Sequence, residues 1–186
     1  SLGNRVNVSG DGDVSITATR GGALANDDGV FAKATAGAGG IYFAANAASA
    51  TAGDTSTTFA KVGDDVVIGS RGDFSVVANS TTRQKAESTG ITVGGLALGA
   101  ALANASADTR TAATIGNNIG GTTAGIAAAT PKMMGKLSVR ANGNDTNLAS
   151  TFAGGGGLIS GAASMATTNG KSSVGATVGG NAGRAC

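Results

Sequence analysis

The feature that most limits how this chain can fold is a repeat that occurs three times. The segments GDVSITATR, GDFSVVANS and GKLSVRANG begin at Gly12, Gly72 and Gly135, so their starts are 60 and then 63 residues apart. Repeats of this kind are typical of stacked architectures, in which each unit buries its apolar face only against its neighbours. The period therefore favours a linear stack over one large core.

Two further features follow each copy in the same order. A glycine-rich run of small residues begins at Gly37, Gly94 and Gly154, and each run closes on an apolar residue followed by glycine. The closing signals are Val62-Gly63-Asp64, Ile115-Gly116-Asn117 and Val178-Gly179-Gly180. We interpret residues 1–186 as one repetitive segment, with units of approximately 12–71, 72–134 and 135–186.

The segments that begin each unit have the pattern of half-buried strands. In Gly12–Arg20 the apolar residues Val14, Ile16 and Ala18 alternate with serine and threonine. A period of two with β-branched residues predicts a strand, and the Gly-Asp or Gly-Lys pair before each segment predicts the turn that enters it. The same alternation occurs at Phe74, Val76 and Ala78, and at Leu137, Val139 and Ala141.

The run Gly94–Asn118 admits two interpretations, because alanine is the best helix former. A helix over Leu96–Ala107 would place its leucines without the spacing of an apolar stripe, and the run lacks the charged residues of an exposed helix. Alanine returns at every second position, at Ala101, Ala103, Ala105 and Ala107. We favour a strand with one tightly packed face, with the helix as the alternative.

The intervals between these features contain residues that form turns or adopt positive φ. The single proline, Pro131, precedes the third strand signal and is expected at a corner or sheet edge. The expected turns are Gly21-Gly22, Asn26-Asp27-Asp28-Gly29, Gly53-Asp54, Asn117-Asn118 and Asn142-Gly143-Asn144-Asp145.

Composition agrees with a thin core. The chain has 33 glycines and no tryptophan, and its 41% hydrophobic content is mostly alanine and valine. The predicted fold is all-β: an elongated β-solenoid, similar to a parallel β-helix, built from about three repeats. Coils of about 20 residues would give three coils per unit and a rise of some 14 Å. An antiparallel winding of the alanine runs stays open as an alternative.

With these motifs laid out, the chain resembles the repeats of large bacterial filamentous adhesins. The resemblance covers essentially the whole chain and is carried by the GDVSITAT-type segments, the small-residue runs and the (V/I)G(D/N) signals. This family comprises haemagglutinin- and leukotoxin-type exoproteins, exported by two-partner or autotransporter secretion. The resemblance implies a structural shaft on the bacterial cell surface, without catalytic residues. A glycan- or host-protein-binding module is the alternative function, and a β-helical polysaccharide-processing enzyme is a weaker one.

Several observations bear on partners and location. No apolar run approaches the roughly 18 residues of a membrane-spanning helix, and the start SLGNRVNVSG is not a signal peptide. We therefore expect an internal fragment of a longer extracellular chain.

Cys186 is the only cysteine, so no disulfide forms within the chain. Open strand edges at both ends predict end-to-end stacking into filaments. Arg83 and Lys85 are the nearest thing to a basic cluster, so nucleic acid is not an expected partner.

Candidate chemistry is sparse, and we assign no catalytic, metal or cofactor residue. The chain has no histidine, and neither Gly37–Gly40 nor Gly154–Gly157 continues as a phosphate-binding loop. Calcium is the strongest ligand hypothesis, although turn-forming Asx residues explain the same positions. Its candidate ligands are Asp11, Asp13, Asp27, Asp28, Asp64 and Asp65. An ice-binding face would need a regular threonine array, which is not formed by Thr17, Thr19, Thr55, Thr57, Thr58, Thr109, Thr111 and Thr114.

Overall fold

The computed structural model describes residues 1–21, 29–70, 72–119 and 135–180, and these residues form an all-β protein. Pro131, Asp27, Asp28 and Cys186 lie outside the described residues. The strands are β1 (Asn7–Gly10), β2 (Val14–Arg20), β3 (Val30–Val62), β4 (Val67–Ser70), β5 (Phe74–Ile115), β6 (Leu137–Gly156) and β7 (Ile159–Val178). Within the described ranges there is no helix, hence none that is long and apolar enough to cross a membrane.

Every strand pairing is parallel and joins corresponding residues of successive repeats. The long strand β5 lies in the centre, with β2 and β3 along one edge and β6 and β7 along the other. Val14 pairs with Phe74, and Phe74 pairs with Leu137, so the three strand segments expected from the sequence lie side by side in register. The parallel pairing also answers the question of winding, because no antiparallel pairing joins the described strands.

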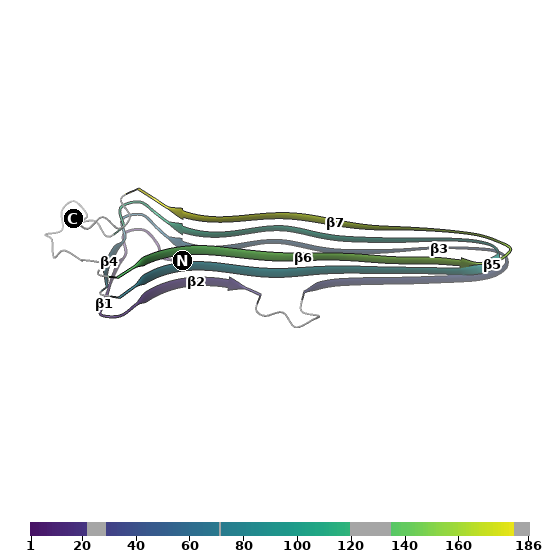
Figure 1. Cartoon of the computed structure of the whole chain (residues 1–186), viewed down its shortest axis with the longest axis horizontal. Helices are drawn as coiled ribbons and strands as arrows, with labels where there is room; N and C mark the ends of the chain where they lie inside the picture. The colour runs from purple at the N-terminus through teal and green to yellow at the C-terminus, as the bar shows by residue number, and fades with distance from the viewer. Residues whose placement is uncertain (22–28, 71, 120–134, 181–186) are drawn as a thin grey trace.

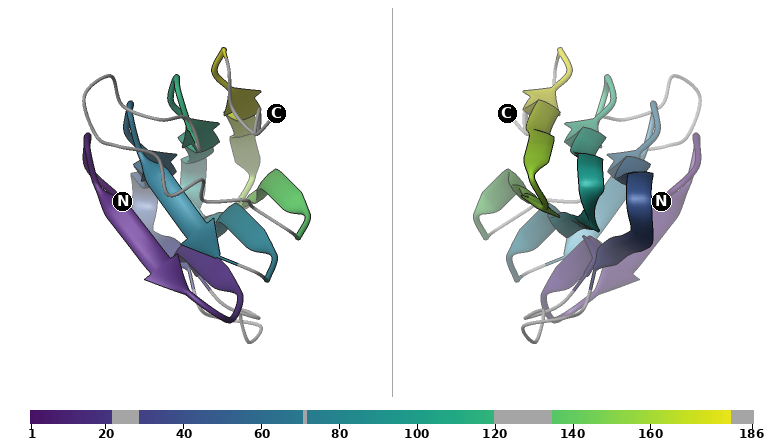
Figure 2. Two further views of the ribbon diagram at one scale, coloured as in Figure 1. Left: turned by 90° about the vertical axis from the view of Figure 1, so that its left-hand side faces the viewer. Right: turned by 90° about the vertical axis from the view of Figure 1, so that its right-hand side faces the viewer.

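Each repeat runs out along the long axis and then back (Figure 1). The reversal lies at the glycine-rich runs, since the Thr92 hydroxyl donates to the Leu98 carbonyl oxygen at 3.2 Å within β5. In β3 the Asn46 side-chain amide donates to the Ala36 carbonyl oxygen at 3.1 Å in the same way. β6 and β7 are the outward and return legs of the third repeat. Viewed along the long axis, the levels of the stack lie side by side (Figure 2).

The alanine-rich run is a strand, as the alternation favours. It forms the return leg of β5, and Ala101, Ala103, Ala105 and Ala107 are all buried between the two legs. Leu98 and Leu102, which broke the helical spacing, have the opposite parity and are exposed. The small residues therefore face inward because the two legs approach closely there.

The coil length of about 20 residues that the sequence led us to expect is wrong. Described strand partners lie between 53 and 63 residues apart, as in Phe43 with Leu96 and Phe74 with Leu137. One repeat therefore adds one strand spacing, about 4.8 Å, and not the expected 14 Å.

Two of the expected turns are also wrong. Gly53-Asp54 lies inside β3, and Asn142-Gly143-Asn144-Asp145 lies inside β6. Strand pairing with β5 continues through both segments. Because a strand can hold Asx residues wherever hydrogen bonds satisfy their side chains, local turn preference is overridden. The positive φ expected of Gly21 and of Asn118 is present, at 65° and 56°.

The core consists of two small apolar clusters between the legs. The larger cluster lies near the ends opposite the reversal and contains Phe74, Val62, Ile68 and Ile115, all fully or almost fully buried. The buried members of the second cluster are all alanines: Ala50, Ala52, Ala86, Ala103 and Ala105. Since alanine buries little surface, the close approach of backbones contributes more here than large side chains do.

We predict that Ala105→Leu destabilises the protein, because the fully buried Ala105 side chain has no space around it for a larger one. Overpacking of this kind costs about 1–3 kcal/mol in the free energy of unfolding. Chemical denaturation measures the change. Ala45→Leu is the matched control, since Ala45 is exposed on β3 and pairs with Leu98. Equal stability of the two variants would contradict the buried alanine face.

Candidate functional site

The closing signals of the repeats stack into a corner held by Asx side chains. The Asp64 backbone N–H donates to Asn4 Oδ1 at 3.0 Å, and the Asn117 backbone N–H donates to Asp64 Oδ1 at 2.7 Å. The Gly180 backbone N–H donates to Asn117 Oδ1 at 3.0 Å. Each side chain thus accepts a hydrogen bond from the corresponding residue of the next level.

A second corner, where each outward leg begins, has the same arrangement. The Asp73 backbone N–H donates to Asp13 Oδ1 at 2.8 Å, and the Lys136 backbone N–H donates to Asp73 Oδ1 at 2.7 Å. We call the two series Asx ladders. Charged or polar acceptors of this kind satisfy backbone donors that a turn would otherwise leave to water.

The Asx ladders contain two of the four described calcium candidates, and a third accepts a side-chain hydrogen bond. Asp13 and Asp64 each receive a backbone donor, and Asp65 Oδ1 accepts from the Asn118 side chain at 3.0 Å. Asp11 also has an interaction within the protein. In the part of the chain that the structure describes, no three carboxylate or thiol groups gather where they could hold a metal ion.

Beside both Asx ladders, neighbouring levels approach so closely that only glycine fits. A Cβ placed on Gly116 would lie 2.5 Å from the Gly63 carbonyl oxygen. At the second corner, a Cβ on Gly135 would lie 2.5 Å from the Gly72 carbonyl carbon. Real Cβ atoms do not approach backbone this closely, so these glycines are determined by stacking.

A row of polar side chains crosses the interior between the two apolar clusters. Its centre is Asp145 on β6, whose Oδ1 accepts from the Thr82 hydroxyl at 2.5 Å. Its Oδ2 accepts from the Ser172 hydroxyl at 2.7 Å and from the Thr109 hydroxyl. The three hydroxyls come from both legs of the second repeat and from the return leg of the third. One carboxylate therefore connects four strand segments across two levels.

Partial burial tends to raise the pKa of Asp145, but its hydrogen bonds outweigh burial. Donation from Ser172, Thr109 and Thr82, together with the charge of Arg20, lowers the pKa below its usual value of 3.8. Hydrogen bonds to the charged form favour that form. The folded protein therefore holds Asp145 ionised more strongly than the unfolded chain does.

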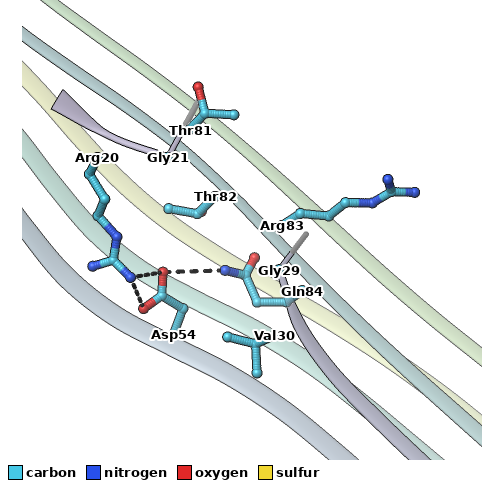
Figure 3. Close-up of a pocket in the computed structure, with 9 residues that line it drawn as sticks. All are labelled: Arg20, Gly21, Gly29, Val30, Asp54, Thr81, Thr82, Arg83 and Gln84. Carbon is cyan, nitrogen blue, oxygen red and sulfur yellow. Dashed lines mark hydrogen bonds and ion pairs between the residues drawn. The ribbon is translucent and has the colours of Figure 1, made fainter. Parts of the chain in front are cut away.

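An open cavity of about 380 Å³ adjoins this polar row (Figure 3). It lies where strand pairing of the first repeat with β5 stops at Arg20 and resumes at Val30. Arg20 Nη2 binds the Asp54 carboxylate at 2.9 and 3.1 Å, and Gln84 Nε2 lies 3.5 Å from the same carboxylate. Arg83 points away from Asp54 (Figure 3). The described lining of the cavity offers hydrogen-bonding groups.

Gln84 is the most unusual side chain of the cavity. It is fully buried, and its Oε1 has no hydrogen-bond partner among the described residues. Sequence reading missed Gln84, Asp54 and Asp145 as interior polar residues. The alternation of the strand could have revealed them. Asp54 lies two residues after Ala52 and four after Ala50, so it points to the same side of β3 as these buried alanines.

The remaining candidates are placed as follows. Lys85 forms an ion pair with Glu87 at 2.7 Å, and its Nζ lies 5.4 Å from the centre of the Phe31 ring. Its hydrogen bond is the main reason why the pKa of Glu87 is lowered. Thr109 and Thr111 are buried, so they do not share an exposed face with Thr17 and Thr19.

Large apolar side chains are exposed at the end where the legs reverse. Ile41 and Tyr42 are each 86% exposed, and Leu158 of the third repeat is 96% exposed. Phe43 and Ile159 continue the surface, and we call these five residues the apolar tip. Gly95 of the second repeat packs against the backbone of Ile41 and Tyr42.

Comparison with family models, curated proteins and solved structures finds no match for the chain.

We predict that Asp145 stabilises the folded protein at neutral pH and that this contribution is lost in acid. Because its folded-state pKa is lowered, the contribution is complete above the unfolded-state pKa and is lost as pH falls through the lower folded-state pKa. Asp145→Asn should therefore unfold more easily than the wild type at neutral pH and converge with it in acid. Denaturation at a series of pH values measures this, with the exposed Asp108→Asn as control. A constant difference at all pH values would contradict the prediction.

Proposed function

We propose that this chain is a segment of the structural shaft of a secreted bacterial surface adhesin or extracellular fibre, without catalytic activity. The shaft is an elongated β-solenoid of the parallel β-helix kind, in which each repeat makes one flattened coil. The register is the observation that carries this proposal. Val62, Ile115 and Val178 occupy one column, so the chain returns to the same place one level on after each repeat.

The geometry supports a mechanical role over a chemical one. Each level contacts only its neighbours, so repeats can be added without changing the structure of earlier ones. One leg of β5, from Phe74 to Gly94, spans about 65 Å at roughly 3.3 Å per residue. The resulting shaft is a broad ribbon that lengthens by about 4.8 Å per repeat.

Surface location and export are part of the proposal and are supported by the resemblance to secreted repeat proteins. A stack in which backbone hydrogen bonds and small side chains supply the cohesion needs no cofactor. The sparse, nearly balanced charge of +2 gives no reason to expect a nucleic-acid partner.

Two measurements test the shaft. We expect far-UV circular dichroism to be dominated by β-structure, and small-angle scattering to give a particle about 65 Å long, the length of one leg. Antibodies against the chain should label intact source cells. A compact, helix-rich particle would exclude the solenoid, and labelling only after permeabilisation would exclude the surface location.

A binding module is the second candidate function, and the apolar tip favours it. Adjacent aromatic residues that are largely exposed, as Tyr42 and Phe43 are, commonly mark interaction surfaces. The expected partner is a glycan or a host protein bound at the edge of the ribbon where the legs reverse.

We predict that Tyr42→Ser together with Phe43→Ser abolishes any binding of the chain to glycan arrays or host matrix proteins. Stacking and apolar contact with the rings would be lost, while the core residues remain unchanged. Phe59→Ser is the control, because Phe59 is exposed away from the tip and packs near Arg110. Wild-type binding that survives the double substitution, or no binding by the wild type, would remove this function.

A further inference from the structure

Charged side chains are absent from the end of the ribbon where the legs reverse. All 13 basic and 11 acidic residues of the chain lie outside the runs 34–53, 88–107 and 146–170. Each run contains the reversal of one repeat (Figure 1). At least six residues on each leg therefore carry no charge, which corresponds to about 20 Å at 3.3 Å per residue. We call this part of the ribbon the uncharged end.

The border of the uncharged end is aligned between levels. On the outward legs Lys33 pairs with Glu87, and on the return legs Asp108 pairs with Lys171. Every repeat thus places its charges on the same side of this border. The segregation of charge is a property of each level and does not depend on which level comes first or last.

The uncharged end exposes apolar side chains on the apolar tip and also on the faces behind the tip. Ile91, Val93 and Phe152 are exposed on the outward legs, and Leu102 and Met165 are exposed on the return legs. Large apolar patches on a protein surface mark interaction sites. The partner of this end must accept an apolar surface and needs no complementary charge.

The dimensions of the tip favour a fluid partner over a rigid one. Three levels about 4.8 Å apart and two legs about 10 Å apart give an end face of roughly 15 Å by 10 Å. A stable protein interface needs about 800 Å² from each partner, which is several times this area. Lipid, in contrast, can surround both faces of the ribbon behind the tip as well as the end itself.

The chemistry of the tip also favours lipid over a glycan. Of its five side chains only that of Tyr42 can form a hydrogen bond, whereas a site for a polar ligand provides several placed donors and acceptors. A tyrosine beside aliphatic residues is typical of a membrane–water interface, where the ring lies in the apolar layer and the hydroxyl faces water.

We propose that the apolar tip inserts into the surface of a lipid bilayer. The backbone limits the depth, because the pairing of β3 with β5 skips Ile41 and Tyr42 and unpaired backbone groups are costly in the hydrocarbon core. The tip therefore lies at the boundary of headgroups and acyl chains, about 5–10 Å deep. The charged border, about 20 Å away, stays in water. This contact goes beyond the shaft and has a different partner from the second candidate function.

Tyr42 reports the insertion directly, because the chain has one tyrosine and no tryptophan. We expect vesicles of phosphatidylcholine to reduce the quenching of Tyr42 fluorescence by acrylamide about twofold or more, since the ring leaves water. High salt should not release the protein, because no charged side chain takes part in the contact. Unchanged quenching in the presence of vesicles, or release by salt, would overturn the proposal.

A double substitution tests the tip and keeps the fluorescent probe. Leu158→Ser together with Ile159→Ser should weaken partition into the vesicles by about tenfold or more, because two large apolar side chains are lost from the contact. Phe31→Ser together with Phe59→Ser is the matched control, since these rings are 53% and 48% exposed but lie outside the uncharged end.

Vesicle flotation measures the partition, and circular dichroism checks that both double variants keep the fold. Equal loss of partition in the two variants, or no loss in either, would overturn the proposal. If a variant does not fold, the quenching of Tyr42 in the wild type still decides. A wild-type chain that binds a glycan array but not the vesicles would overturn the lipid contact and leave the second candidate function. An elongated, β-rich chain that binds neither would overturn the lipid contact and leave the shaft.

Discussion

The structure depends on one constraint: corresponding backbone segments must lie one strand spacing apart along their whole length. Parallel pairing carries hydrogen bonds at every level, but it leaves no room for a Cβ where the chain turns a corner. Gly116 and Gly135 are therefore fixed by the carbonyl groups beneath them. The same constraint limits the interior, because two legs that pair tightly with neighbours and face one another leave space mainly for alanine.

A core of alanine alone would provide little burial energy, and the interior compensates in two ways. Phe74 and the aliphatic residues around it form an ordinary apolar cluster near the corners. Farther along the legs, Asp145 and its three hydroxyl donors connect successive levels through hydrogen bonds. Such a polar row stabilises the fold only when its members are hydrogen-bonded, since an unpaired buried polar group lowers the free energy of unfolding. Among the described residues, Ser80 Oγ and Gln84 Oε1 have no such partner, and Gln84 lies beside the cavity.

The strand segments that begin each unit could be predicted from the repeat, because Gly12, Gly72 and Gly135 mark equivalent positions. Parallel or antiparallel winding stayed open, and the parallel register comes from the structure. The length of the coil could not be predicted, since Gly53-Asp54 has the local chemistry of a turn. Whether such a pair turns the chain or lies in a strand depends on the partner level, and that information is not local. The polar row was hidden for the same reason, as Asp145 was counted as a turn residue and not by its parity.

The Asx ladders give the stack a direction. Asp64 accepts from the backbone of the level above it, and its own backbone donates to the level below. A side chain of one repeat thus positions the next repeat, and the next repeat contributes only a backbone N–H to the hydrogen bond. Lys136 and Gly180 are held in the same way although neither is an Asx residue, because each donates only its backbone N–H to the preceding level. The direction of the stack is therefore set by side chains that accept and by backbone groups that donate.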